Sequence, residues 1–133
     1  MRKSLALRRL FSCLPAAALS ACMLAPPAPL GLMDVAERPA EKALLAGMRA
    51  YDDAQYPLAE EQLTEALKTG LVSQKDRAAA HKHLAFIYCT SNRTPACEAE
   101  FRLARQADPG FGLSKAESGH PLWGPVWKRV QPP

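Results

Sequence analysis

Four cysteines are the residues of this chain best suited to covalent chemistry: Cys13, Cys22, Cys89 and Cys97. Two lie within the first 22 residues, and the other two are separated by seven residues in the second half of the chain. A C-x7-C spacing is not a redox motif of the C-x-x-C kind. The other possible fates of these thiols are a lipid modification, a structural cross-link, burial as a small apolar residue or, for Cys13, removal with an N-terminal signal. The choice depends on the compartment and on the elements that hold the cysteines.

The histidines and carboxylates form no catalytic or metal-binding pattern. His81 and His83 are two residues apart and would face different sides of a helix, whereas a zinc-binding helix places its histidines at i and i+4. His120 is distant from both, and neither a glycine-rich phosphate loop nor a G-x-S-x-G motif occurs. We therefore expect no enzyme, no metal, no cofactor and no small-molecule substrate. An acidic cluster is better explained as a solvated helix face than as paired catalytic carboxylates; its members are Asp52, Asp53, Glu60, Glu61 and Glu65.

Residues 1–21 have the pattern of an export signal. Basic residues occupy positions 2, 3, 8 and 9 with no acid among them, and an uncharged, mostly apolar run follows over residues 10–19. A basic start, a short apolar run and small residues before a cut are typical of secretory signals. A transmembrane helix needs roughly 20 apolar residues, so the run is too short for a permanent span.

The signal ends in Leu19-Ser20-Ala21-Cys22, which resembles the lipobox of bacterial lipoproteins. The resemblance implies that the Cys22 thiol receives a diacylglyceryl group, that the chain is cut before Cys22, and that the new amino terminus is acylated. Two or more acyl chains anchor a protein stably in a membrane. Met23 follows in place of the Asp that retains such lipoproteins in the inner membrane, so the resemblance favours the periplasmic face of the outer membrane. The alternative is an ordinary signal with a chance cysteine.

Removing the signal changes the charge balance and leaves two further regions. Four of the 17 Lys and Arg residues lie in the signal, and none of the 13 acids does, so 13 of each sign remain. The sequence pI near 9.0 is therefore no evidence for nucleic-acid binding, which needs a basic patch on the folded part. Residues 22–39 contain four prolines and form a semi-rigid linker, at about 3.1 Å per residue. Residues 40–133 are left for one small helical domain.

The composition of the third region favours an all-α fold. Ala, Leu, Glu, Lys and Arg dominate it, and strand-like alternation does not occur. Proline near a helix start and glycine after a helix end mark the boundaries. Thr94 is expected to cap the helix that follows it. The predicted helices cover residues 40–53, 57–70, 74–89 and about 95–107.

The two helix pairs repeat each other at a shift of 38 residues. The shift places Gly47 on Ala85, Ala59 on Cys97, Glu60 on Glu98, Leu63 on Phe101 and Ala66 on Ala104. These positions resemble the small-and-large pattern of tetratricopeptide repeats, although any pair of helical hairpins would give much of it. Stacks of such repeats need three or more units or a capping element. The expected cap is the C-terminal segment, which would cover the exposed face of the fourth predicted helix through Phe111, Leu113, Leu122, Trp123, Val126 and Trp127.

A stripe of side chains recurs on the first helix of each pair. In tetratricopeptide folds this stripe lines the concave groove that binds peptides or partner helices. The resemblance thus implies a partner surface, and the alternative is a plain core under the C-terminal cap. The candidate partner-binding residues are Leu44, Met48, Tyr51, Lys82 and Phe86, and Cys89 continues the stripe.

Cys89 and Cys97 fall on either side of the predicted turn between the last two long helices. A short hairpin can bring their Cα atoms within the roughly 4.4–6.8 Å that a disulfide requires. Exported proteins meet an oxidising compartment, so a structural disulfide is the preferred prediction. It would stabilise the fold by about 2.5 kcal/mol on the chain-entropy model. The alternatives are two free, buried cysteines or a redox-active pair.

Two segments suggest a family. Residues 86–101, FIYCTSNRTPACEAEF, and residues 119–127, GHPLWGPVW, resemble the small TssQ-type lipoproteins associated with type VI secretion clusters of proteobacteria, over roughly residues 40–130. The resemblance implies an accessory scaffold at the cell envelope, with an envelope or secretion-apparatus protein as its partner. The alternative function is a pilotin- or chaperone-like binder of another exported protein. The Gly-, Pro- and Trp-rich segment 119–127 would be a docking element or the cap itself.

Overall fold

A computed structural model describes residues 38–132, and within this range the chain forms six helices and no strand. The all-α prediction is thereby confirmed. The export signal, Cys22 and the linker up to residue 37 lie outside the described residues. The helices are α2 (Pro39–Asp52), α3 (Tyr56–Thr69), α4 (Gln74–Thr90), α5 (Thr94–Ala107), α6 (Lys115–Ser118) and α7 (Gly124–Arg129).

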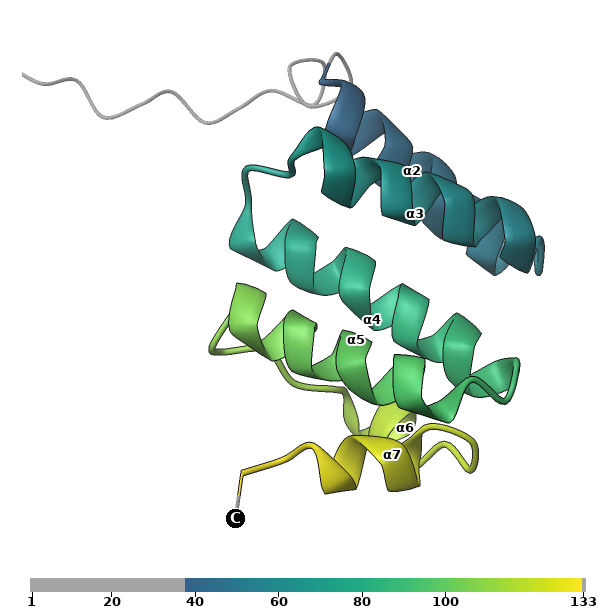
Figure 1. Cartoon of the computed structure of the whole chain (residues 1–133), viewed down its shortest axis with the longest axis vertical. Helices are drawn as coiled ribbons and strands as arrows, with labels where there is room; N and C mark the ends of the chain where they lie inside the picture. Colours follow the sequence, from purple (N-terminus) through teal and green to yellow (C-terminus); the bar gives the residue numbers. More distant parts are fainter. Residues whose placement is uncertain (1–37, 133) are drawn as a thin grey trace, which may run out of the picture.

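The helices stack as two hairpins followed by a short C-terminal segment (Figure 1). Helices α2 and α3 form the first hairpin, α4 and α5 form the second, and α6 and α7 lie at the end of the stack beyond α5. Each long helix starts and ends within about one residue of the range that proline, glycine and periodicity predict. The C-terminal segment thus occupies the place of the capping element that two repeats require.

The turns inside the two hairpins have the same hydrogen bonds. Ala54 adopts φ 58° in the first turn and Asn92 adopts φ 59° in the second. The next residue donates its N–H back into the preceding helix, from Gln55 to the Ala50 carbonyl at 2.7 Å and from Arg93 to the Tyr88 carbonyl at 2.8 Å. All of these positions differ by 38, so the sequence repeat is also a repeat of backbone geometry.

The expected Thr94 cap is wrong by one residue. Arg93 is the N-cap of α5, makes no side-chain capping hydrogen bond, and accepts from Cys97 N–H through its carbonyl at 3.0 Å. The tight turn brings the Arg93 carbonyl into the helical ladder first, so Thr94 becomes the first helical residue. By contrast, Ser73 caps α4 through its side chain, which accepts from Asp76 N–H at 3.2 Å.

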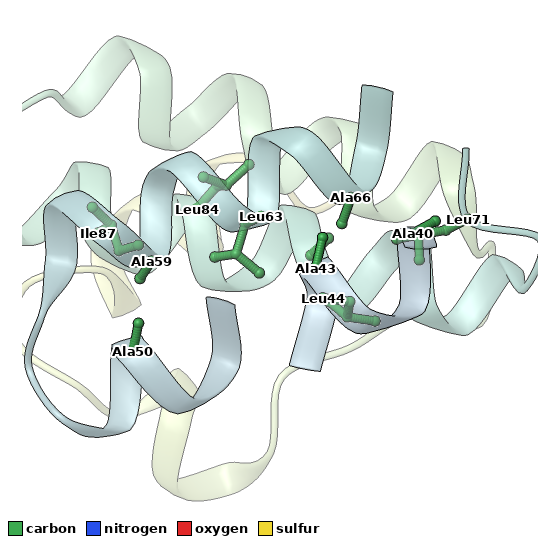
Figure 2. Close-up of a cluster of buried hydrophobic side chains, with 11 residues drawn as sticks. Ala40, Ala43, Leu44, Ala50, Ala59, Leu63, Ala66, Leu71, Leu84 and Ile87 are labelled. Carbon is green, nitrogen blue, oxygen red and sulfur yellow. The ribbon is translucent and has the colours of Figure 1, made fainter. Parts of the chain in front are cut away.

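The first core is aliphatic and holds the two hairpins together (Figure 2). Leu63 of α3 is fully buried and lies against α2 at Gly47, where an added Cβ would sit 2.7 Å from the Leu63 Cγ. Leu84 and Ile87 of α4 also belong to this cluster, so the first hairpin packs directly on the first helix of the second hairpin. Small residues at the α2–α3 contact permit this close approach of the backbones.

The second core is aromatic and contains the two cysteines. Phe101 of α5 is fully buried and packs against Trp127 of α7, with ring centroids 5.3 Å apart. Arg105 donates to the carbonyl of Val130 and so holds the end of α7 against α5. The C-terminal segment is therefore part of the core rather than a loose tail. The cluster consists of Ala85, Phe86, Cys89, Cys97, Phe101, Val126, Trp127 and Val130, with Phe111, Leu113 and Trp123 at its edge.

Candidate functional site

Four of the five predicted partner-binding residues pack in or against the two cores, and Lys82 belongs to neither. Leu44 and Phe86 are only 5% and 4% exposed, whereas Met48, Tyr51 and Lys82 remain partly exposed. Leu44 and Met48 belong to the aliphatic core. Tyr51 of α2 lies close to Phe86 of α4, with ring centroids 6.3 Å apart. Lys82, also on α4, places its Nζ 5.7 Å from the Phe86 centroid. We call these three residues the aromatic face.

The C-terminal segment covers this aromatic face through Trp123. Its indole stacks on the Phe86 ring with centroids 4.2 Å apart and planes 24° from parallel. The other side of the indole stacks on the His120 ring, and the indole N–H donates to the Glu117 carbonyl at 2.8 Å. Trp123 thus packs on α4, whereas the sequence placed it over the fourth helix. Leu122, also assigned to the cap, is 50% exposed.

An ion pair joins the same two segments. Lys82 Nζ donates to Glu117 Oε1 at 2.8 Å. The Glu117 Oε2 atom accepts from Ser114 N–H at 2.8 Å, and the Ser114 hydroxyl accepts from Glu117 N–H at 3.2 Å, which is a capping box. Partial burial acts to raise the pKa of Glu117, but the hydrogen bonds from Lys82 and Ser114 outweigh it and lower the pKa. Glu117 is therefore a carboxylate held in place by two donors.

His83 lies beside the aromatic face and is buried. Its ring is edge-on to Tyr51 at 5.2 Å between centroids, and Nδ1 lies 2.7 Å from the Ala79 carbonyl. Burial lowers the pKa of His83, so the ring is neutral near pH 7 and donates its Nδ1–H to that carbonyl. The sequence carries no sign of this, because a histidine that directly follows Lys82 gives no signal of burial. Its neighbour His81 instead pairs with Glu100 of α5 at 2.6 Å.

Cys89 and Cys97 lie at disulfide-bonding distance, with Cα atoms 5.3 Å apart, as the sequence predicts. Both residues are buried in the aromatic core, between the α4–α5 turn and α7. The disulfide cross-links α4 and α5 next to the turn that joins them. It therefore fixes the two helices whose Phe86 and Phe101 side chains contact Trp123 and Trp127.

The acidic cluster separates into a structural residue and a solvated remainder. Glu60 accepts two hydrogen bonds from the Arg93 guanidinium, at 2.9 and 2.7 Å, and joins α3 to the second turn. The hydrogen bond from Arg93 lowers the pKa of Glu60. Arg93 also lies over the Tyr88 ring at 4.2 Å, and burial together with the Glu60 charge raises the pKa of Tyr88 to about 12. The solvated-face interpretation fits the other four acids, all of which are exposed.

Within residues 38–132 no pocket opens on the surface and no three His, Cys, Asp or Glu side chains gather as a metal site would require. No helix in the same range is long and apolar enough to cross a membrane. No family model, no curated protein and no solved structure matches this chain. The candidate site is accordingly a surface, and it consists of the aromatic face and the segment that covers it.

Proposed function

We propose that this chain is a lipid-anchored helical adaptor on the periplasmic face of the outer membrane, and an accessory of a type VI secretion system. The observation that carries the adaptor proposal is the meeting of the two hairpins at the aromatic face. Tyr51 and Lys82 there combine an aromatic ring, a charge and partial exposure, and aromatic residues are enriched where proteins bind proteins.

The sequence supports the anchor. Cys22 at the end of a lipobox-like signal would bear the acyl chains. The proline-rich linker after it would hold the hairpins roughly 40–50 Å from the membrane. Such a tether positions a binding surface in the periplasm, where an envelope complex could reach it. The resemblance of residues 86–101 and 119–127 to TssQ-type lipoproteins supports the secretion-system assignment.

The experiment is a crosslinking pull-down from membranes of the native host. A photoreactive amino acid replaces Met48, which is partly exposed on α2, and in the control it replaces Leu103, which is 38% exposed on α5. We expect secretion-apparatus subunits at position 48, few or none at position 103, and loss of the position-48 crosslinks when Cys22→Ser removes the lipid. Enrichment of unrelated envelope proteins would contradict the secretion assignment.

Charge substitution tests the surface itself. Tyr51→Glu places a charge within the aromatic face, and Met48→Glu places one about a turn before it on α2. Both should abolish capture, since a buried unpaired charge at an interface is costly. Circular dichroism checks that the helices remain. If both variants stay folded and still capture the partner, the adaptor does not use this surface.

The second candidate is a pilotin- or chaperone-like binder of another exported protein. It rests on the same aromatic face, and it differs in what the anchor does for the partner. Under this alternative Cys22→Ser should mislocalise the partner or lead to its degradation. A partner with normal level and position in that variant argues against it.

A further inference from the structure

The C-terminal segment has two parts that are held very differently. Helix α7 inserts Val126 and Trp127 into the aromatic core, where they are 5% and 6% exposed. Helix α6 buries none of its residues. We call residues 114–123 the strap, because they contact the aromatic face chiefly through the side chains of Glu117 and Trp123. The strap is therefore anchored where it joins α7, and few buried contacts hold the rest of it.

The two strap contacts define a simple chemistry. Lys82 offers an ammonium group to a carboxylate at 2.8 Å, and Phe86 offers a ring face to an aromatic ring at 4.2 Å. The Lys82 and Glu117 side chains are 22% and 28% exposed, so water reaches the pair and its net strength is modest. Nothing in these contacts requires that the acid and the ring come from the same chain.

We propose that the strap is an internal occupant of the aromatic face, and that the partner displaces it with a segment of its own that carries a carboxylate and an aromatic ring. This deepens the proposed function and rests on it, since the aromatic face is the surface through which the adaptor would bind. Charge complementarity to Lys82 and stacking on Phe86 select such a segment. The strap then sets a threshold, because the partner must compete with a covalently attached copy of the same groups.

The size of this threshold, which is the affinity that a partner needs in order to displace the strap, follows from two general rules. A tethered segment acts at an effective concentration on the order of millimolar. The apparent affinity of a competitor falls by the fraction of molecules in which the face is uncovered. A weak partner would be excluded, and a partner concentrated at the membrane would bind. Loosening the strap should therefore tighten binding without any change in the aromatic face.

The first test uses the full-length protein in detergent and a labelled peptide of residues 114–123 as the probe. Glu117→Gln combined with Trp123→Ala removes both strap contacts and leaves Lys82 and Phe86 intact. We expect the peptide to bind this variant at least about tenfold more tightly than it binds the wild type. A control peptide with Gln and Ala at the same two places should not bind. Equal binding to variant and wild type would overturn the proposal.

The second test does not depend on the loss of a large side chain. Lys82→Glu sets two carboxylates against each other, and adding Glu117→Lys restores an ion pair of reversed sign. The Ser118 and Gly119 amides bond to the Ser114 and Lys115 carbonyls at 2.8 and 3.2 Å, so their hydrogen exchange reports the strap. We expect about two- to fivefold faster exchange in the single variant and partial recovery in the double variant, since Glu117→Lys also removes the acceptor of the Ser114 N–H. Unchanged exchange in the single variant would contradict the proposal.

Two controls separate the strap from other causes. Exchange in α5 must stay unchanged, which shows that the aromatic core is intact. The wild type must sediment as a monomer, because a dimer that exchanges its straps would refute an internal occupant. Neither test involves the membrane or the secretion apparatus. A failed pull-down with successful peptide binding would therefore overturn the proposed function and leave the strap, and the reverse result would overturn the strap alone.

Discussion

The two hairpins have the same turn geometry and differ in the side chains at matching buried positions. At a shift of 38 the turns have matching hydrogen bonds, and Ala54 and Asn92 have φ angles of 58° and 59°. The buried position held by Leu63 in the first hairpin is held by Phe101 in the second, and both are fully buried. Where the second hairpin has Cys89 and Cys97, the first has Tyr51 and Ala59.

The difference follows the place of each hairpin in the stack. The first rests on Leu84 and Ile87 of its neighbour, and the buried side chains of its core are aliphatic, with tyrosines packed at the edge. The second has no third hairpin beyond it in the described residues. It is closed by a disulfide and covered by a short segment with two tryptophans. A stack of two hairpins therefore ends in a cross-link and aromatic packing in place of a further repeat.

The largest expected effect comes from the matched core positions. Phe101→Ala should lower the free energy of unfolding by about 3–5 kcal/mol, and Leu63→Ala by about 2–5 kcal/mol, because each leaves a cavity in a fully buried site. Urea unfolding of both variants provides the measurement. The comparison predicts that Phe101→Ala also frees α7 and that Leu63→Ala does not. Equal loss of exchange protection in α7 from both would show that the two cores are not separate.

The disulfide gives the next effect, and only the second hairpin has it. Cys89→Ala with Cys97→Ala should cost about 2.5 kcal/mol, because the unfolded chain regains the freedom of an open loop. Thermal unfolding under oxidising and reducing conditions measures it. The wild type should lose stability on reduction, and the double variant should not respond. A wild type that is indifferent to reductant would rule out this contribution.

A pH effect is expected at His83, at the joint between the hairpins. Burial lowers the pKa of His83 in the folded protein. Between this lowered pKa and about pH 6.5, His83 therefore binds a proton in the unfolded chain and stays neutral in the folded one. Stability should fall as the pH drops from about 6.5 toward the lowered folded pKa, with a slope of no more than about 1.4 kcal/mol per unit for one group.

His83→Gln removes that titration and should flatten the profile in this range. Leu45 is the matching position of the first hairpin and is 39% exposed. A histidine introduced there by Leu45→His should add no such slope. Glu60 and Glu117, two of the carboxylates whose pKa is lowered, contribute in a separate and more acidic window. Their stabilisation is lost as the pH falls below about 4.5 through their folded pKa values.

The sequence predicts those features of the fold that local residue patterns determine. Proline, glycine and apolar spacing place the four long helices, and the separation of Cys89 from Cys97 predicts their approach. The path of the chain after Asp108 is different, because no regular element lies between α5 and α6 and long-range contacts decide it. Thus the stacking of Trp123 on Phe86, the ion pair from Lys82 and the burial of His83 could not be read from spacing.

The smallest effect concerns the turns, where the two hairpins are most alike. Ala54 and Asn92 both hold a left-handed backbone, which costs roughly 1–2 kcal/mol for most residues and less for asparagine. Ala54→Asn should therefore raise the free energy of unfolding by up to about 1 kcal/mol, and Asn92→Ala should lower it by a similar amount. Urea unfolding can resolve both signs. If Ala54→Asn is neutral while Asn92→Ala is not, the asparagine side chain contributes a bond in the second turn that the first cannot offer, and the repeat is one of shape without equal energetics.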